Sequence, residues 1–215
     1  KNIIRIPTIL DPDDTPYSVE TKNEKVRLVH LGFSGIHKEK FKNILLALEL
    51  LGEDRIKFEY NIYGSDNKTV LKNIGNDEKL LEKLSDTVKI HGIVNQNQVN
   101  NIYMNSDYSI FIRPQKRSSY AGFPTKLAES MIAGTPVITN NTGDISYFMK
   151  DRKEGFLLND DSPTAIAEIF NKIVKHSSEE KKNMRISARK QAEKSFSYKS
   201  YTELFNQLIY NINGQ

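Results

Sequence analysis

The chain has 215 residues, of which 38% are hydrophobic and 27% charged, and its net charge is +4. These values indicate one folded domain of roughly 150–200 residues with tails, not a disordered chain. The weak positive charge fits an anionic ligand or an anionic membrane face and argues against a nucleic-acid partner. The absence of cysteine excludes disulfides, Cys-ligated zinc and a thiol nucleophile.

Apolar runs of strand length alternate with segments of helical periodicity along most of the chain. In chain order we predict a strand at 25–32, a helix at 41–51, a strand at 56–63, one helix or two short ones at 69–84, a strand at 88–92, a helix at 96–104, a strand at 108–112, a loop at 113–120, a helix at 125–133, a strand at 136–139, a helical turn at 144–149, a strand at 155–158, and helices at 163–175, 179–194 and 198–212. This alternation predicts an α/β fold, a Rossmann-like parallel sheet with helices on both faces.

The first 24 residues differ in character from the rest. Residues 8–24 are polar and contain two prolines, which favours a linker, and residues 3–7 read as the end of a strand that leaves another domain. The start lacks both an initiating Met and a signal peptide. We therefore expect an excised part of a longer, cytoplasmic protein.

The loop after the first strand, residues 32–40, is a candidate phosphate site. Gly32 and Gly35 would let a phosphate approach the backbone, and Lys38 or Lys40 would add charge beside a helix N-terminus. The spacing is neither G-x-G-x-x-G nor a Walker loop, which argues against an NAD site or an NTPase. An ordinary turn with surface lysines is the alternative.

A second loop, residues 113–129, follows a buried strand and runs into a helix. Arg113 and Lys126 flank a Gly-Phe-Pro kink, and backbone amides of residues 122–125 at the helix start would bind an anion. Glu129, one turn further on, would accept two hydroxyl hydrogen bonds, as from a ribose. The alternative is that Glu129 only favours the helix N-terminus and that the basic residues are solvated.

The remaining candidates are weaker. The polar loop 139–144 would line the same cleft, unless Asp144 simply caps a helix. We find no metal ligands at the usual spacing and no serine-nucleophile or kinase motif.

Residues 122–138, GFPTKLAESMIAGTPVI, resemble the signature of the family 4 retaining glycosyltransferases. Residues 88–94, 99–112, 153–158, 163–169 and 195–198 are similar to further family segments in the same order. The resemblance covers residues 25–212. It implies the C-terminal half of a GT-B fold, with residues 1–24 as strand end and linker, 25–195 as the Rossmann-like nucleotide-sugar-binding domain and 196–215 as the helix that closes the fold.

The resemblance also implies site roles. Glu129 would hold the ribose, and either Lys38 or Lys40 would be the phosphate lysine. Gly122, Phe123, Pro124 and Thr125 match the loop whose amides meet the donor sugar and phosphate, and Ile93 and Val94 match the backbone contacts to the base. The family's first motif acid is replaced by Ala121, and Phe33 stands where an arginine is usual, so Arg113 would supply the missing cation.

These features lead to a functional expectation of retaining glycosyl transfer from a UDP- or GDP-linked sugar to a glycan or lipid-linked saccharide. Arg113 and Lys126 are the candidate catalytic cations, and no metal or other cofactor is required. The N-terminal GT-B domain of the same protein would be one partner. The inner face of the membrane, contacted peripherally, would be another. The chain alone would bind nucleotide without turnover. A GT-B nucleotide-sugar epimerase and a non-catalytic nucleotide-binding module are the alternatives.

Overall fold

The computed structural model describes residues 5–20, 24–32 and 38–213, and it confirms the α/β prediction. The strands are β1 (Val26–Leu31), β2 (Phe58–Tyr63), β3 (Val88–Gly92), β4 (Tyr108–Phe111), β5 (Val137–Asn140) and β6 (Gly155–Leu158). The helices are α1 (Phe41–Leu50), α2 (Asn67–Asn73), α3 (Glu78–Lys83), α4 (Gln96–Met104), α5 (Arg117–Ala121), α6 (Thr125–Ile132), α7 (Ile145–Phe148), α8 (Pro163–Ile173), α9 (Ser178–Phe196) and α10 (Thr202–Asn213), with 3₁₀ turns η1 (Gly52–Lys57) and η2 (Tyr198–Tyr201).

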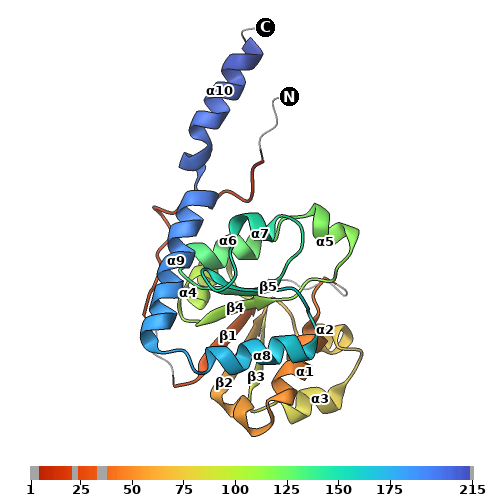
Figure 1. Cartoon of the computed structure of the whole chain (residues 1–215). Coiled ribbons are helices and arrows are strands. Elements are labelled where there is room, and N and C mark those ends of the chain that lie inside the picture. Colours follow the sequence, from red (N-terminus) through yellow and green to blue (C-terminus); the bar gives the residue numbers. More distant parts are fainter. Residues whose placement is uncertain (1–4, 21–23, 33–37, 214–215) are drawn as a thin grey trace.

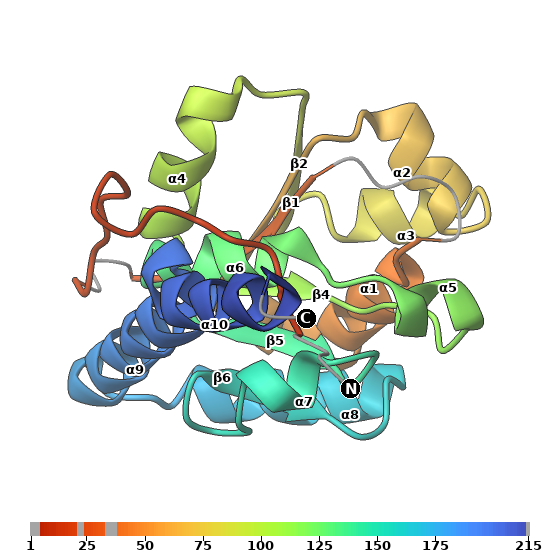
Figure 2. The same ribbon diagram turned by 90° about the horizontal axis from the view of Figure 1, so that it is seen from above.

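The six strands form one parallel sheet in the order β3-β2-β1-β4-β5-β6. Helices α1, α2, α3 and α8 cover one face, and α4, α6, α7 and α9 cover the other (Figures 1 and 2). The chain runs from β1 through β2 to β3 at one edge of the sheet. It then crosses back to β4 on the other side of β1 and continues through β5 to β6 at the opposite edge. Because the winding reverses there, the carboxyl ends of β1 and β4 border a crevice, the usual ligand position in such sheets.

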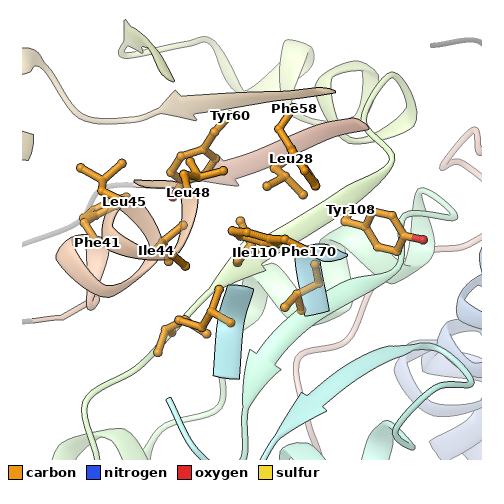
Figure 3. Packing of buried hydrophobic residues seen from close by; sticks show 14 of the residues in the cluster. Leu28, Phe41, Ile44, Leu45, Leu48, Phe58, Tyr60, Tyr108, Ile110 and Phe170 are labelled. Atoms are coloured by element: carbon orange, nitrogen blue, oxygen red, sulfur yellow. The ribbon is translucent and has the colours of Figure 1, made fainter. Parts of the chain in front are cut away.

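The larger core cluster lies between the sheet and the α1–α8 face (Figure 3). Helical spacing on α1 places Ile44, Leu45 and Leu48 on one buried stripe, and Phe170 of α8 lies against Phe58 of β2 with ring centroids 5.4 Å apart. Burial of an aliphatic or aromatic side chain of this size contributes about 1.5–3 kcal/mol. This packing fixes the strands whose ends carry the candidate site.

Two local predictions differ from the structure, and for a third the structure decides between two alternatives. The strand predicted from residue 56 begins at Phe58, because residues 52–57 continue α1 as the 3₁₀ turn η1. Of the two alternatives for the segment 69–84, the structure has the pair of short helices, α2 and α3, with Gly75 and Asn76 between them at positive φ. The loop predicted at 113–120 was wrong in part, since residues 117–121 form the short helix α5.

The polar N-terminal segment, predicted to be a linker, is bound to the domain by two buried arginines of α9. Arg185 donates to the carbonyl of Ser18 at 2.9 Å and to two carbonyls at the end of α4. Arg189 donates to the carbonyls of residues 12, 15 and 132. The Leu10 amide donates to the Phe196 carbonyl at 2.7 Å. The chain thus runs along α9 before it enters β1.

Helix α10 extends away from the sheet (Figure 1). It presents large apolar side chains to solvent, namely Leu204, Phe205, Ile209 and Tyr210. Among the described residues, none of the helices combines the length and the apolar character that crossing a membrane requires. An exposed apolar helix face of this kind is typical of a surface that another protein part covers.

Candidate functional site

The candidate site lies at the carboxyl edge of the sheet, where β1 and β4 diverge. Gly32 follows β1, Arg113 follows β4, and the N-terminus of α6 begins at Thr125. The Cβ that a side chain at Gly32 would add lies 3.8 Å from Lys126 Nζ, so Gly32 and Lys126 are neighbours. The structure therefore brings together residues from both loops that the sequence singled out.

The N-terminus of α6 is suited to bind an anion. Pro124 occupies the N-cap in an extended conformation and makes no side-chain cap, while Leu127 N–H bonds to the Pro124 carbonyl at 3.0 Å. The first N–H groups of a helix have no partner within the helix. Those of Thr125 and Lys126 thus face outward with the positive end of the helix dipole.

Arg113 is held at this edge by defined contacts. Its Nη1 donates to the Gly122 carbonyl at 2.9 Å and lies 3.5 Å from Thr142 Oγ1. The Asn140 side chain bonds to both the N–H and the carbonyl of Arg113, at 2.9 and 2.7 Å. Burial lowers the pKa of Arg113 and Glu39 opposes this, yet a guanidinium stays charged in proteins. Arg113 therefore presents a positioned cation next to the Gly-Phe-Pro loop.

Lys126 points from α6 to the end of β1. Its Nζ forms an ion pair of 2.7 Å with Glu39, in which the lysine side chain is 15% exposed and the glutamate 7%. Nζ also lies 3.5 Å from His30 Nε2 and 5.5 Å from the centre of the Phe111 ring. Burial, followed by the charge of Lys126, keeps the pKa of His30 well below its ordinary value. The ammonium thus has a carboxylate and a neutral imidazole as neighbours.

Glu129 lies one turn along α6 and is half-buried. Burial raises the pKa of its carboxyl, and the nearby Lys126 opposes the shift. A hydroxyl pair can satisfy such a carboxylate without adding charge to the site. The predicted ribose role is compatible with this position and stays a prediction.

The predicted phosphate lysines occupy different environments. Lys40 Nζ forms a bidentate ion pair with Asp161, at 2.8 and 2.9 Å. Asp161 also lies 3.2 Å from Asn140 Nδ2, so Lys40 belongs to a bonded network beside Arg113. Lys38 is exposed. Gly35 lies outside the residues that the structure describes.

The other predicted contacts are at the same edge or pack near it. Ile93 directly follows β3 and is 89% exposed, and Val94 is half-buried. The ring of Phe123 packs against Phe148 and Phe196, with centroids 5.3 and 5.7 Å away. Phe123 therefore anchors the loop, and only its backbone remains for the predicted donor contact.

Sequence reasoning did not single out three polar residues of this edge, Glu39, His30 and Asp161, whereas Asn140 belongs to the loop 139–144 that it did select. Asp161 follows the end of β6 by three residues, a position that the edge rule could have found. No sequence signal separates Glu39 from Lys38 and Lys40, because which of these consecutive side chains turns inward depends on the tertiary fold. In the part of the chain that the structure describes, no cluster of His, Asp and Glu could hold a metal ion.

A cavity lies elsewhere, on another part of the surface. Between β6, α8 and α9 a cavity of about 430 Å³ is lined by Phe156, Lys172, His176 and Met184, among others, and none of the predicted site residues borders it. The β1–β4 edge instead concentrates a helix N-terminus and two positioned cations. We place the site at this edge because ligand chemistry, and not volume, distinguishes the two positions.

A family model, "Glycosyl transferases group 1", matches residues 19–191. The chain belongs to this family. No curated protein matches it by sequence. Solved structures of GT-B glycosyltransferases share its fold. A mutant of TarM from S. aureus, in complex with fondaparinux, α-GlcNAc-glycerol and UDP, superposes with a TM-score of 0.73 at 18% identity, over 97% of this chain and 39% of that one.

Two further structures show the same likeness. Sucrose-phosphate synthase from Thermosynechococcus elongatus has a TM-score of 0.72 and 15% identity, over 97% of this chain and 52% of that one. HepE from Anabaena, in complex with UDP and glucose, has a TM-score of 0.67 and 14% identity, over 89% and 49%. The chain is thus a Rossmann-like GT-B domain that spans between two fifths and about half of these glycosyltransferase chains.

Proposed function

We propose that this domain is the donor-binding half of a retaining glycosyltransferase of the family 4 type, and that it binds a UDP- or GDP-linked sugar at the β1–β4 edge. The observation that carries the proposal is that Arg113, Lys126 and the uncapped N-terminus of α6 lie at the same edge of the sheet. The group 1 family match and the UDP present in the TarM and HepE complexes support a sugar nucleotide as the ligand.

The chemistry follows from where charge develops. When the bond between the sugar and the diphosphate breaks, negative charge grows on the leaving diphosphate. Positioned cations and helix N–H groups stabilise this charge more than the charge of the ground state, which lowers the barrier. Arg113 forks onto phosphate oxygens, and the Thr125 and Lys126 amides bind at the helix tip. No step in this scheme needs a metal ion.

The acceptor, a glycan or a lipid-linked saccharide, would bind to the N-terminal half of the protein. The apolar face of α10, with Leu204, Phe205, Ile209 and Tyr210, is the surface that this half would cover. On this proposal the chain alone binds nucleotide, and turnover requires both halves. A cytoplasmic position, with contact to the inner face of the membrane, belongs to the same proposal.

Calorimetric titration of UDP and GDP into the chain tests the donor site. We expect one of the two nucleotides to bind, and Glu129→Ala to weaken it about tenfold through the loss of two hydroxyl contacts. Glu168→Ala, on the distant helix α8, serves as the control. Equal affinity of wild type and Glu129→Ala would contradict the ribose role.

Ala121, in place of the motif acid, favours a second candidate, a non-catalytic binding module. Product analysis of the full-length protein with nucleotide sugars separates the candidates. Transfer to an acceptor supports the glycosyltransferase, interconversion of free nucleotide sugar supports an epimerase, and binding without reaction supports the module.

A further inference from the structure

The ion pair between Glu39 and Lys126 adds little to the free energy of folding. Glu39 Oε1 bonds to Lys126 Nζ at 2.7 Å, whereas Glu39 Oε2 is buried and makes no hydrogen bond with any described group. A buried carboxylate oxygen without a donor costs stability, and a buried ion pair by itself returns little. The pair is therefore better explained by what it does to the ammonium than by folding.

The surroundings of Lys126 direct its ammonium. An ammonium has three N–H donors. One is used by Glu39 Oε1, and a second faces His30 Nε2 at 3.5 Å, the outer limit of a hydrogen bond. Gly32 lies next to the ammonium and has no side chain, and a Cβ added to Gly32 would lie 3.8 Å from Lys126 Nζ. The Lys126 side chain is 15% exposed, so part of it stays open to solvent at the carboxyl end of β1.

We propose that Glu39 is a positioning residue, which fixes the Lys126 ammonium so that its remaining N–H donor meets the diphosphate of a nucleotide sugar. The inference rests on the proposed function. Without Glu39 the long lysine side chain has many rotamers, and each one lost on binding weakens affinity. Glu39 itself neither contacts the ligand nor takes part in the reaction.

Two effects of Glu39 oppose each other, and two substitutions separate them. Its negative charge repels a diphosphate, while its hydrogen bond holds the ammonium that attracts one. Glu39→Gln and Glu39→Ala both remove the charge, but only glutamine keeps an oxygen that accepts from Lys126. The difference between these two variants therefore measures positioning alone.

The experiment is calorimetric titration of the chain with UDP and GDP. We expect Glu39→Gln to bind at least as tightly as wild type and Glu39→Ala about tenfold more weakly than Glu39→Gln, a difference of about 1.4 kcal/mol. In a Lys126→Met background the difference should vanish, because the residue through which Glu39 acts is gone. Glu49→Gln and Glu49→Ala, at the exposed ion pair with Lys83, should bind alike.

Equal affinities of Glu39→Gln and Glu39→Ala, or a difference that persists with Lys126→Met, would overturn the inference and leave the proposed function intact. Failure of the wild type to bind either nucleotide would overturn both. If Glu39→Ala does not fold, as its thermal transition would show, Glu39→Met fills the same volume without an acceptor and takes its place.

Discussion

Arg185 provides a sharp test of how the N-terminal segment is held. Its side chain is among the largest that are fully buried, and its guanidinium donates to the carbonyls of Ser18, Ser106 and Met104 at 2.9, 2.6 and 2.8 Å. Burial lowers the pKa of Arg185, and the charge of Asp107 opposes this. We predict that Arg185→Met, which keeps the length of the side chain and removes its donors, destabilises the chain substantially.

The magnitude follows from these contacts. Each hydrogen bond to a charged group contributes about 1.5 kcal/mol or more, so three bonds contribute about 4.5 kcal/mol. Part of this is offset because methionine carries no buried charge that must be desolvated. We expect a net loss of about 3 kcal/mol, or a fall in Tm of roughly 6–12 °C for a domain of this size.

Urea or thermal unfolding, followed by circular dichroism, measures the loss. Lys182→Met is the matched control, because Lys182 is exposed on the same helix and should change stability by less than about 0.5 kcal/mol. Limited proteolysis should also cut Arg185→Met faster within residues 10–20. A variant as stable as the control would refute the view that this arginine fixes the segment.

Three further predictions concern other parts of the fold. Because the pKa of His30 is lowered in the folded state, its neutral ring stabilises the chain above pH 6.5, and this contribution is lost as the pH falls below that value. In His30→Gln the free energy of unfolding should therefore depend less steeply on pH below 6.5, by up to about 1.4 kcal/mol per pH unit. Parallel curves for the two proteins would count against this. Gly64→Ala places a Cβ 2.6 Å from the Gly32 carbonyl carbon, on a residue whose φ is +86°, and should lower the free energy of unfolding by more than about 2 kcal/mol. Gly52→Ala, where the Cβ meets open space, should lower it by about half as much, as measured by urea unfolding. Ile209→Glu, in the apolar face of α10, should weaken co-purification with the N-terminal half and leave nucleotide affinity unchanged; unchanged co-purification would show that this face is not the contact.

Hydrophobic periodicity was sufficient to predict the strand and helix order, because the core strands and α1 are buried on the faces that the pattern marks. It could not predict α5, a helix of only five residues that has no apolar repeat. It also missed that α9 buries Arg185 and Arg189, since an arginine in a sequence looks like a surface residue until its carbonyl partners are brought near by the fold.

Only part of the candidate site could be predicted from the sequence. Arg113 and Lys126 could be selected because they follow strand ends or open helices, positions that parallel sheets assign to ligands. Glu39 could not, because its role depends on Lys126, which is 87 residues away in the sequence. The pairing of Lys40 with Asp161 was equally hidden, because those two residues lie 121 positions apart.

The most direct test is a crystal structure of the chain with a bound UDP- or GDP-sugar. Our account predicts the diphosphate at the β1–β4 edge, within hydrogen-bond distance of the Thr125 and Lys126 amides and of Arg113, with the ribose on Glu129. A ligand seated in the cavity between β6, α8 and α9, with the α6 N-terminus left empty, would contradict it.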